Sequence, residues 1–496
     1  MTNLSELLPA GASGKKATFT ASGSISSGDT VILNANGTVS VVAAIAQSVG
    51  SATAFDSNTA YYFDAVYDTN ENKVVVSYAD TGNSNYLTVV VGTVSGTSIS
   101  FGTATVCYSY AVNHTSIAFN STTNAVAVAF VATGLAGNWG RHAIGTVSGT
   151  TFTLGGTGDF YGASAREPEI AYDSGSNKWV VVVTGVANAN YLYVYTAVAN
   201  STSSISWYGA VNVNAAASYY PSILYSSEVD RVLIFYSDGG NSYYGTCRVG
   251  QINSSGTGYD WGSEVVFASA TAYYTEIAFD SVTTQVILCF RNSSNNYYPA
   301  VKMGTVSGSG TSSTVSFGSL AEVTDRGYGA QPPGVCYDTV NRKVVMTTRD
   351  TSTGRPYMYI GTVSGTSLSF GSGTELSTQS VQGSAFSYGV VIYDPDEAKV
   401  VSIVSFSSGT TGGHGFVIQL PSSNALPGPA FLGIAEEAIS DSATGEITLL
   451  GGVSEKLSSL TIGSTYYVQS DGSISTTSTS ITAGVAISAT TILLNG

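Results

Sequence analysis

Charged residues are scarce in this chain of 496 residues, and acidic residues outnumber basic ones. Only 10% of the residues are charged, and 17 Lys and Arg stand against 32 Asp and Glu, which gives a formal net charge of −15. Because nucleic-acid binding depends on Lys and Arg that neutralise phosphates, this composition argues against a nucleic-acid partner. Ser, Thr, Gly, Asn and Tyr are left to cover the surface, which favours a particle or extracellular protein over a metabolic enzyme.

Long apolar runs are also missing. Residues 1–16 contain no apolar core of the kind that a signal peptide needs. No run elsewhere approaches the roughly 18 apolar residues that a membrane-spanning helix requires. We therefore expect neither signal-peptide secretion nor membrane insertion.

Cysteine and histidine are too few, and too scattered, to suggest a metal site or a disulfide framework. The cysteines are Cys107, Cys247, Cys289 and Cys336. They show no CxxC or Cys/His zinc spacing, so we expect buried free thiols. No catalytic triad or Gly-rich phosphate loop is present either. The sequence thus predicts no bound metal and no cofactor, and leaves open whether calcium binds at acidic turns.

What the chain has in abundance is internal repetition, because a unit of roughly fifty residues occurs seven times. The first marker of the unit is an aromatic residue followed by a turn residue, at intervals of 52 to 58 residues. These aromatic residues are Tyr67, Phe119, Tyr172, Tyr225, Phe279, Tyr337 and Tyr393. A Gly-Thr-Val-Ser-Gly turn recurs in step, and a Gly near an aromatic residue or Leu follows it. The later glycines are Gly102, Gly155, Gly209, Gly262, Gly318 and Gly371. Such periodicity predicts a repeat architecture.

Each repeat contains four short runs of strand-forming residues. In the first repeat they cover residues 63–67, 73–78, 86–91 and 98–106, with Asp, Asn and Gly turns between them. Four strands and three turns make one small antiparallel sheet, and such a sheet cannot bury both of its faces alone. The sequence therefore predicts an all-β fold whose body is a seven-bladed β-propeller with four-stranded antiparallel blades.

The seventh repeat lacks a fourth strand, because its third run ends at Leu420 and Pro421 follows. Upstream of the first repeat, residues 38–45 form another strand-like run. We expect this N-terminal strand to complete the last blade and to remove two exposed sheet edges. The propeller would then cover residues 38–424.

The two ends of the chain resemble each other. The segment from Gly28 to Gly37 matches the segment from Gly463 to Gly472, and each carries an Asn-Gly or Asp-Gly hairpin signal. We expect residues 1–37 and 425–496 to form one small split β-domain, with Ala425–Pro429 as the linker into it.

The same ends carry a resemblance to a known family. The segments are Asn3-Leu-Ser-Glu-Leu-Leu-Pro-Ala-Gly, Gly28-Asp-Thr-Val-Ile-Leu, Phe431-Leu-Gly-Ile-Ala-Glu-Glu-Ala-Ile-Ser-Asp, Gly463-Ser-Thr-Tyr-Tyr-Val and Ala483-Gly-Val-Ala-Ile-Ser-Ala-Thr. They resemble the terminal modules of virion proteins from tailed, largely marine, bacteriophages, which are described as tail fibres, tail-associated proteins or capsid appendages. The resemblance covers about 110 residues at the two ends. It implies a virion location, other virion proteins as partners and a homo-oligomer, usually a trimer in fibres, although the sequence has no heptad repeats.

A candidate ligand site follows from the propeller geometry, in which the fourth-to-first and second-to-third connections emerge on one face. The positions just before the first strands are Tyr62, His114, Arg166, Glu167, Tyr220, Tyr274 and Tyr388. The second-to-third turns supply Asn85, Tyr86, Asn190, Tyr191, Tyr243 and Tyr297. Tyr rings stack on sugars and Asn amides bond their hydroxyls, so the pattern suits a glycan or a protein receptor. Tyr is also a good strand former and Asn a common turn residue, which is the structural alternative.

Three functions remain open at this point. The first is a non-enzymatic phage appendage that binds a host-surface glycan or protein, and the second is a structural decoration protein without a ligand. The third is a polysaccharide hydrolase, which would need two carboxylates about 5 to 10 Å apart. Glu167 has no evident inward partner, and a sialidase would want several arginines where only Arg166 maps to the mouth. We therefore expect a binding protein and not an enzyme.

Overall fold

The computed structural model describes residues 15–34, 37–42, 46–134, 137–325, 333–383, 389–409, 411–421, 431–469, 471–479 and 481–495. Within these residues the chain consists of β-strands joined by turns and short 3-10 segments, which confirms the predicted all-β class. None of the described segments is a helix long and apolar enough to cross a membrane. The chain divides into two compact units, one of Ser48–Gln419 and one that combines Met1–Gln47 with Leu420–Gly496.

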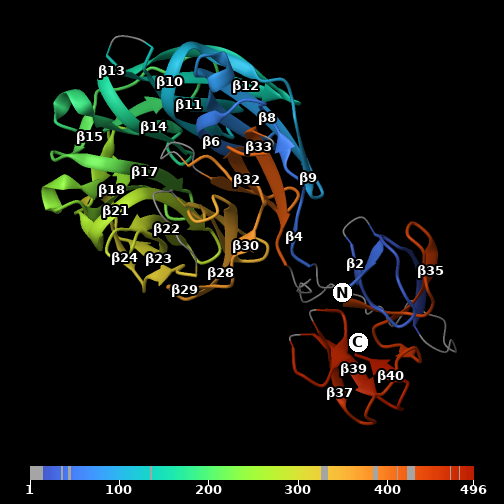
Figure 1. Cartoon of the computed structure of the whole chain (residues 1–496). Coiled ribbons are helices and arrows are strands. Elements are labelled where there is room, and N and C mark those ends of the chain that lie inside the picture. The colour runs from blue at the N-terminus through green and yellow to red at the C-terminus, as the bar shows by residue number, and fades with distance from the viewer. Residues whose placement is uncertain are drawn as a thin grey trace. The chain divides into compact units, whose positions relative to one another are not determined.

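The larger unit is built from seven successive antiparallel sets of strands, which we number as repeats 1 to 7 (Figure 1). Repeat 1 contains β6 (Ala60–Asp68), β7 (Lys73–Asp80), β8 (Tyr86–Ser95), β9 (Ser98–Phe101) and the first half of β10 (Thr105–Asn120). Repeat 2 contains the second half of β10 (Thr105–Asn120), β11 (Ala125–Ala132), β12 (Trp139–Ser148) and the first half of β13 (Thr151–Asp173). Repeat 3 contains the second half of β13, β14 (Lys178–Gly185), β15 (Tyr191–Val198) and β16 (Val211–Asn214). Repeat 4 contains β17 (Ser218–Ser226), β18 (Arg231–Asp238), β19 (Tyr244–Ile252), β20 (Tyr259–Trp261) and the first half of β21 (Val265–Asp280).

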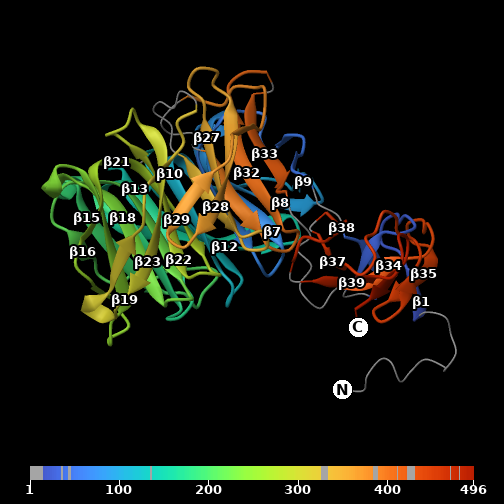
Figure 2. The ribbon, with the colours of Figure 1, turned by 90° about the horizontal axis from the view of Figure 1, so that it is seen from below.

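The last three repeats follow the same plan. Repeat 5 contains the second half of β21, β22 (Gln285–Asn292), β23 (Tyr298–Ser307), β24 (Thr314–Phe317) and β25 (Ala321–Glu322). Repeat 6 contains β26 (Gly334–Asp338), β27 (Lys343–Arg349), β28 (Pro356–Ser364), β29 (Ser367–Phe370) and β30 (Thr374–Glu375). Repeat 7 contains β31 (Val390–Asp394), β32 (Lys399–Phe406) and β33 (Gly412–Gln419), and β33 pairs with β4 (Ser48–Val49) and β5 (Thr53–Ala54). Figure 2 shows the strands of this unit from a second side, turned by 90°.

The first strands of successive repeats contact one another, and the series of contacts closes on itself. The order of contact is β6, β10, β13, β17, β21, β26, β31 and again β6. Figure 1 accordingly shows the blue β6 beside the orange β32 of the last repeat. Val, Ile and Phe of the second and third strands fill the spaces between neighbouring repeats, as in the cluster that joins Val76 and Val90 to Val401 and Val417. Each sheet is therefore buried against the next one.

A glycine of the fourth strand explains one of the sequence markers. A Cβ atom added at Gly102 would overlap the carbonyl oxygen of Thr150 in the next repeat, and Gly262 lies in the same way against Ser313. Gly155 and Gly318 make equivalent approaches to the following repeats. These four marker glycines are thus needed because the neighbouring repeat leaves no room for a side chain, whereas Gly209 and Gly371 have space around them.

The strand that completes repeat 7 was predicted wrongly. Residues 38–45 were expected to supply it, but β3 (Val39–Val41) pairs with β2 (Thr30–Leu33) in the smaller unit. The physical reason is local, because a short turn joins these two strands and Asn34 N donates to Thr38 O over 2.8 Å. Residues 43–45 lie outside the described residues, and β4 and β5 take the place beside β33.

Gly50, directly after β4, is the signal that could have found this strand. It lies 52 residues before Gly102, and a Cβ atom there would overlap the carbonyl oxygen of Thr97 in repeat 1. The larger unit consequently begins at Ser48 and ends at Gln419 instead of covering residues 38–424.

The smaller unit combines strands from both ends of the chain. One five-stranded sheet has the order β1 (Lys16–Thr20), β35 (Thr444–Leu449), β34 (Phe431–Ala435), β2 and β3. A second has the order β36 (Val453–Ser454), β40 (Ile492–Leu494), β39 (Thr482–Ala486), β37 (Thr465–Val468) and β38 (Ile474–Ser475). Lys16 pairs with both Glu436 and Glu446 over 3.0 Å, so an ion-pair network joins the two termini. The expected linker Ala425–Pro429 lies outside the described residues.

Candidate ligand-binding site

The predicted positions before the first strands share an unusual backbone conformation. Five of them are non-glycine residues with φ between 48° and 53°, in the left-handed region. They are Tyr62, His114, Glu167, Tyr220 and Tyr274. Each coincides with a break in the strand register, so each sits on a bulge that re-aims its side chain. The equivalent Tyr388 lies outside the described residues.

These bulge residues contact one another between repeats. The rings of Tyr62 and His114 are 5.0 Å apart, and those of Tyr220 and Tyr274 are 4.5 Å apart. The Glu167 carboxylate accepts a hydrogen bond from the Tyr220 backbone N–H at 2.8 Å. Burial, together with the positive charge of Arg166, lowers the pKa of His114 to about 4, so this imidazole is neutral at pH 7.

The second-to-third turns serve two different purposes. Several begin with a 3-10 segment, namely η2 (Thr81–Asn83), η3 (Val186–Asn188) and η4 (Gly239–Asn241). Asn85 and Asn190 adopt left-handed conformations there, and their carbonyl oxygens accept backbone N–H bonds from Val112 and Ser218 at 2.9 Å. These asparagines therefore shape the turns, in agreement with the structural alternative.

Tyr86 and Tyr191 take part in strand pairing. They are the first residues of β8 and β15 and lie opposite Asp80 and Gly185. In the other two turns, tyrosine takes the left-handed position: Tyr243 has φ 60° and Tyr297 has φ 60°. These two tyrosines are 45% and 41% exposed, so both reach the solvent.

The structure brings the tyrosines of repeats 4 and 5 into one cluster with two arginines. We call it the tyrosine–arginine cluster, and its members are Arg166, Tyr219, Tyr220, Tyr243, Tyr273, Tyr274, Arg291 and Tyr297. Ring centroids lie 5.8 Å apart for Tyr219 and Tyr243, 5.8 Å for Tyr273 and Tyr297, and 5.4 Å for Tyr220 and Tyr273. The rings therefore form a continuous aromatic surface across two repeats.

Each arginine of the cluster lies over tyrosine rings. The Arg166 guanidinium is 5.1 Å from the centroid of Tyr219. The Arg291 guanidinium is 4.8 Å from Tyr297, 5.1 Å from Tyr273 and 5.5 Å from Tyr274. Such cation–π contacts fix the rings and keep a positive charge within the aromatic surface.

Arg291 was missed in the sequence, although a signal for it existed. It lies near the end of β22, opposite Tyr273 in the ladder. In four other repeats the equivalent residues are uncharged: Ala79, Val131, Thr184 and Ser237. Repeat 6 has an arginine at the same position, Arg349, so repeats 5 and 6 depart from the others, and the departure becomes visible only when the repeats are aligned strand by strand.

A cavity of about 450 Å³ lies beside this cluster. It is lined by Asn113, His114, Asn138, Ser164, Ala165, Arg166, Glu167, Val186, Tyr220 and Tyr274. Its volume falls in the range of small-molecule sites, and it combines amide, ionic and aromatic groups. The predicted residues His114, Arg166, Glu167, Tyr220 and Tyr274 thus line one space.

Glu167 has carboxylate neighbours, although the sequence suggested no inward partner for it. Glu167, Glu169 and Glu276 line one small cavity of about 40 Å³, and Glu276 shares another of about 290 Å³ with Asp64. Burial and the nearby Asp64 raise the pKa of Glu276 to about 8, and burial raises the pKa of Asp64 to about 6. Burial and like charges also raise the pKa of Glu169.

Asp64, Glu169 and Glu276 lie three residues before the aromatic markers, where the alternating strand pattern turns side chains inward. In the part of the chain that the structure describes, no three His, Cys, Asp or Glu side chains are grouped to hold a metal ion. All four cysteines are free and buried, which confirms that part of the prediction.

No protein-family model matches the chain, and no curated protein matches it. A solved structure of a protein of unknown function from Dyadobacter fermentans DSM 18053 aligns with a TM-score of 0.42 and 11% sequence identity. The alignment covers 76% of this chain and 98% of that chain. Similarity this low does not indicate a function, which has to follow from the residues of the site.

Proposed function

We propose that residues 48–419 form a seven-bladed β-propeller with four-stranded antiparallel blades. Seven repeats with first strands in a closed series of contacts support it, and so does the approach of Gly50 to Thr97 between the last repeat and the first. An experimental structure of the full chain tests the proposal. Six or eight sectors around the axis would contradict it.

We further propose that the chain is a non-enzymatic structural protein of a tailed-bacteriophage particle, a tail fibre or capsid appendage, that attaches to a glycan on the host surface. The terminal segments support the phage origin through their resemblance to virion modules, and the smaller unit would dock on the particle. The observation that carries the binding role is the tyrosine–arginine cluster beside the cavity of about 450 Å³. Exposed tyrosine faces stack on sugar rings while neighbouring polar groups bond hydroxyls.

Glycan binding is tested with the full chain on an array of bacterial surface polysaccharides. We expect binding that is lost when Tyr243→Asn and Tyr297→Asn are combined, because asparagine keeps the turn but removes the stacking faces. The matched control is Tyr110→Asn, since Tyr110 is exposed and contacts Tyr108 outside the cluster. If no polysaccharide on the array bound the chain, glycan attachment would be contradicted, and a structural decoration protein without a ligand would be the remaining proposal.

The virion location needs a separate test. Antibodies against the full chain should label particles of the phage that encodes it, at the tail or on the capsid, in immunogold microscopy. Label confined to lysate protein, with bare particles, would contradict the virion role.

A polysaccharide hydrolase is the second candidate, and one observation favours it. Glu167, Glu169 and Glu276 line a common cavity, and a raised pKa keeps a carboxyl group protonated so that it can serve as a general acid. The test is the release of reducing ends from polysaccharides that the chain binds. Release that is abolished in Glu169→Gln or Glu276→Gln would establish the enzyme, and binding without release would exclude it for those polymers.

A further inference from the structure

Arg291 is a buried cation without an anionic partner. Its side chain belongs to a residue that is only 7% exposed, and its Nε has no hydrogen-bond partner. Within the described residues no carboxylate lies within ion-pair distance of it, and three tyrosine rings surround the guanidinium. Burial accordingly lowers the pKa of Arg291.

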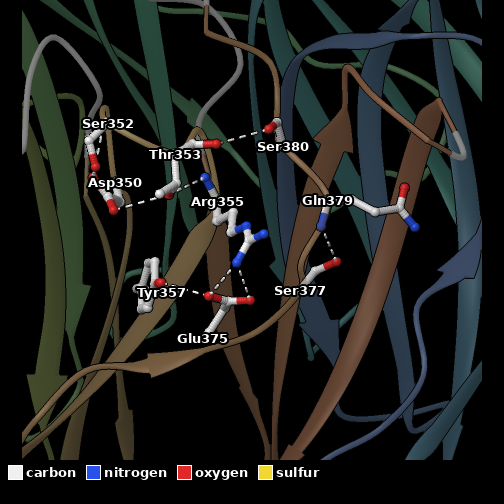
Figure 3. A network of polar contacts seen from close by, with 9 residues as sticks. All are labelled: Asp350, Ser352, Thr353, Arg355, Tyr357, Glu375, Ser377, Gln379 and Ser380. Atoms are coloured by element: carbon white, nitrogen blue, oxygen red, sulfur yellow. Dashed lines mark hydrogen bonds and ion pairs between the residues drawn. The ribbon is translucent and has the colours of Figure 1, made fainter.

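Two other arginines at this end of the strands, Arg141 and Arg355, pair with carboxylates. Arg141 stacks on Tyr108 in a similar way, but its Nε lies 2.9 Å from the Asp159 carboxylate. Arg355 in repeat 6 lies 3.1 Å from Glu375, which also accepts a bond from the Tyr357 hydroxyl at 2.7 Å. Figure 3 shows Arg355 and Tyr357 converging on Glu375. Arg349 occupies the position of Arg291 in repeat 6, and its Nε likewise has no hydrogen-bond partner, but its charge interacts with that of Asp350. Arg291 differs in the three tyrosine rings that surround it.

One carboxylate of repeat 5 is engaged by two asparagines. Glu322 of β25 pairs with the third strand in repeat 5 as Glu375 of β30 does in repeat 6. Its two oxygens accept bonds from Asn292 at 2.7 Å and from Asn295 at 2.6 Å. Glu167, which lines the cavity of about 450 Å³, accepts the backbone N–H of Tyr220.

A buried cation is costly unless a negative group compensates it, and aromatic rings provide only part of that compensation. A guanidinium presents a planar pair of donors that matches a carboxylate. Arg166 extends the positive region, because its guanidinium lies over Tyr219, which contacts Tyr220 at 6.3 Å. The charge of Arg166 interacts with that of Glu167, whereas Arg291 makes no ion pair among the described residues. In a chain of formal charge −15, this positive region is fitted to receive an anion from outside.

We propose that the tyrosine–arginine cluster binds an acidic saccharide, with a sugar carboxylate paired to Arg291 and the sugar faces stacked on Tyr243 and Tyr297. Arg166 provides a second positive charge for a neighbouring acidic sugar of the same chain. The inference rests on the proposed glycan-binding function and names the class of glycan.

The test compares carboxylated polysaccharides with their neutral forms on the full chain, by isothermal titration calorimetry. The probes are polygalacturonate, alginate and hyaluronate, the methyl ester of each, and dextran sulfate as a sulfated polymer. We expect at least one carboxylated polymer to bind more than tenfold tighter than its ester, with a preference that shrinks as salt concentration rises. This comparison uses the unmodified protein, so it does not depend on whether a variant folds.

Two variants of Arg291 then test whether this residue causes the preference for the carboxylated polymer. Arg291→Gln should reduce the affinity for the acid form about tenfold or more and bring it close to that of the ester, whereas Arg291→Lys should retain part of the preference. Arg355→Gln is the matched control and should bind like the unmodified chain, because Arg355 belongs to the paired network outside the cluster. Thermal unfolding of each variant checks that it is folded.

The outcomes separate this inference from the function on which it rests. Equal affinity for acids and esters, or acid preference untouched by Arg291→Gln in a folded protein, would overturn the acidic-saccharide inference and leave glycan binding in place. Tighter binding of dextran sulfate than of every carboxylated polymer would overturn the choice of carboxylate. No binding to any polymer here or on the glycan array would overturn both proposals.

Discussion

The two ends of the strands in residues 48–419 differ in how strictly they repeat. At one end, the first-to-second turns carry a buried polar side chain in every repeat, and these residues are Asp68, Asn120, Asp173, Ser226, Asp280, Asp338 and Asp394. Most of these side chains accept backbone N–H bonds from the residues two and three positions later, as Asp280 does from Val282 and Thr283 at 2.9 and 3.0 Å. At the other end, the equivalent positions range from Asn to Tyr.

The difference indicates that the two ends of each strand have different roles, one in stability and one in binding. The regular end satisfies buried polar groups and packs each repeat against the next, so its residues are fixed by the fold. The variable end is held by main-chain bonds, as at Asn85 and Asn190, which leaves side chains free to differ. Variation on a constant frame is how a scaffold acquires a binding site. Substitutions at the regular end should therefore cost stability, and those at the variable end should cost binding.

The largest effect is expected from Gly262→Ala at the regular end. The new Cβ would overlap the carbonyl oxygen of Ser313 in the next repeat, and backbone cannot move aside as a flexible side chain can. Overpacking of this kind should lower the free energy of unfolding by about 3 kcal/mol, measured by urea denaturation. Gly209→Ala is the matched control, because Gly209 belongs to the same marker series but has open space around it. Equal stability of the two variants would remove the packing explanation.

The next largest effect is expected from Asp280→Ala. This side chain accepts two backbone N–H bonds and the Thr283 hydroxyl at 2.5 Å, and it is fully buried. Alanine leaves those donors without partners, which should cost about 2 kcal/mol in unfolding free energy. Asp260→Ala, at an exposed position, should change it little. A cost below that of Asp260→Ala would mean that water replaces the carboxylate, and the turns would then not distinguish the two ends.

The regular end is also the part that sequence periodicity predicts best. The aromatic markers, the turns and the marker glycines recur with a fixed interval, so strand positions such as β7 and the capping role of Asp280 follow from the pattern. The strand beside β33 was missed because the predicted run Val39–Val41 forms a local hairpin, whereas Gly50 has a role that only contact with the next repeat reveals.

Only those site residues that recur at the interval of the repeats were predictable from the sequence. The bulge residues His114, Glu167, Tyr220 and Tyr274 do follow it, and they line one cavity or its neighbour. Arg291 belongs to a different strand from Tyr273, and pairing register between strands brings them together. Likewise, Glu169 and Glu276 are more than 100 residues apart, and they meet only because their repeats converge.

At the variable end, Tyr297→Asn should separate binding from stability. Asparagine occupies the same left-handed position in repeats 1 and 3, so the turn is retained and the free energy of unfolding should change by less than about 0.5 kcal/mol. Loss of the stacking face should weaken glycan binding about tenfold, or about 1.4 kcal/mol, by titration calorimetry. Tyr110→Asn, at an exposed tyrosine outside the cluster, should leave affinity unchanged. If Tyr297→Asn lost stability and kept its glycan affinity, the variable end would contribute to stability and not to binding.

The smallest effect concerns the inward carboxylates, which lie between the two ends. Because burial and like charge raise the pKa of Glu276 to about 8, the folded protein holds this proton while the unfolded chain, with an ordinary glutamate, releases it near pH 4.5. Stability from Glu276 is therefore complete below pH 4.5 and declines as pH rises to about 8. Glu276→Gln has no carboxyl proton to lose, so it should gain stability relative to the unmodified chain over that interval, by less than about 1 kcal/mol because Glu276 is an exposed residue whose charge solvent screens. Urea denaturation at pH 4.5, 6 and 8 measures the difference, with the exposed Glu455→Gln as control. A difference that stays constant with pH, or one that Glu455→Gln reproduces, would show that the inward carboxylates are as well hydrated in the folded protein as in the unfolded chain.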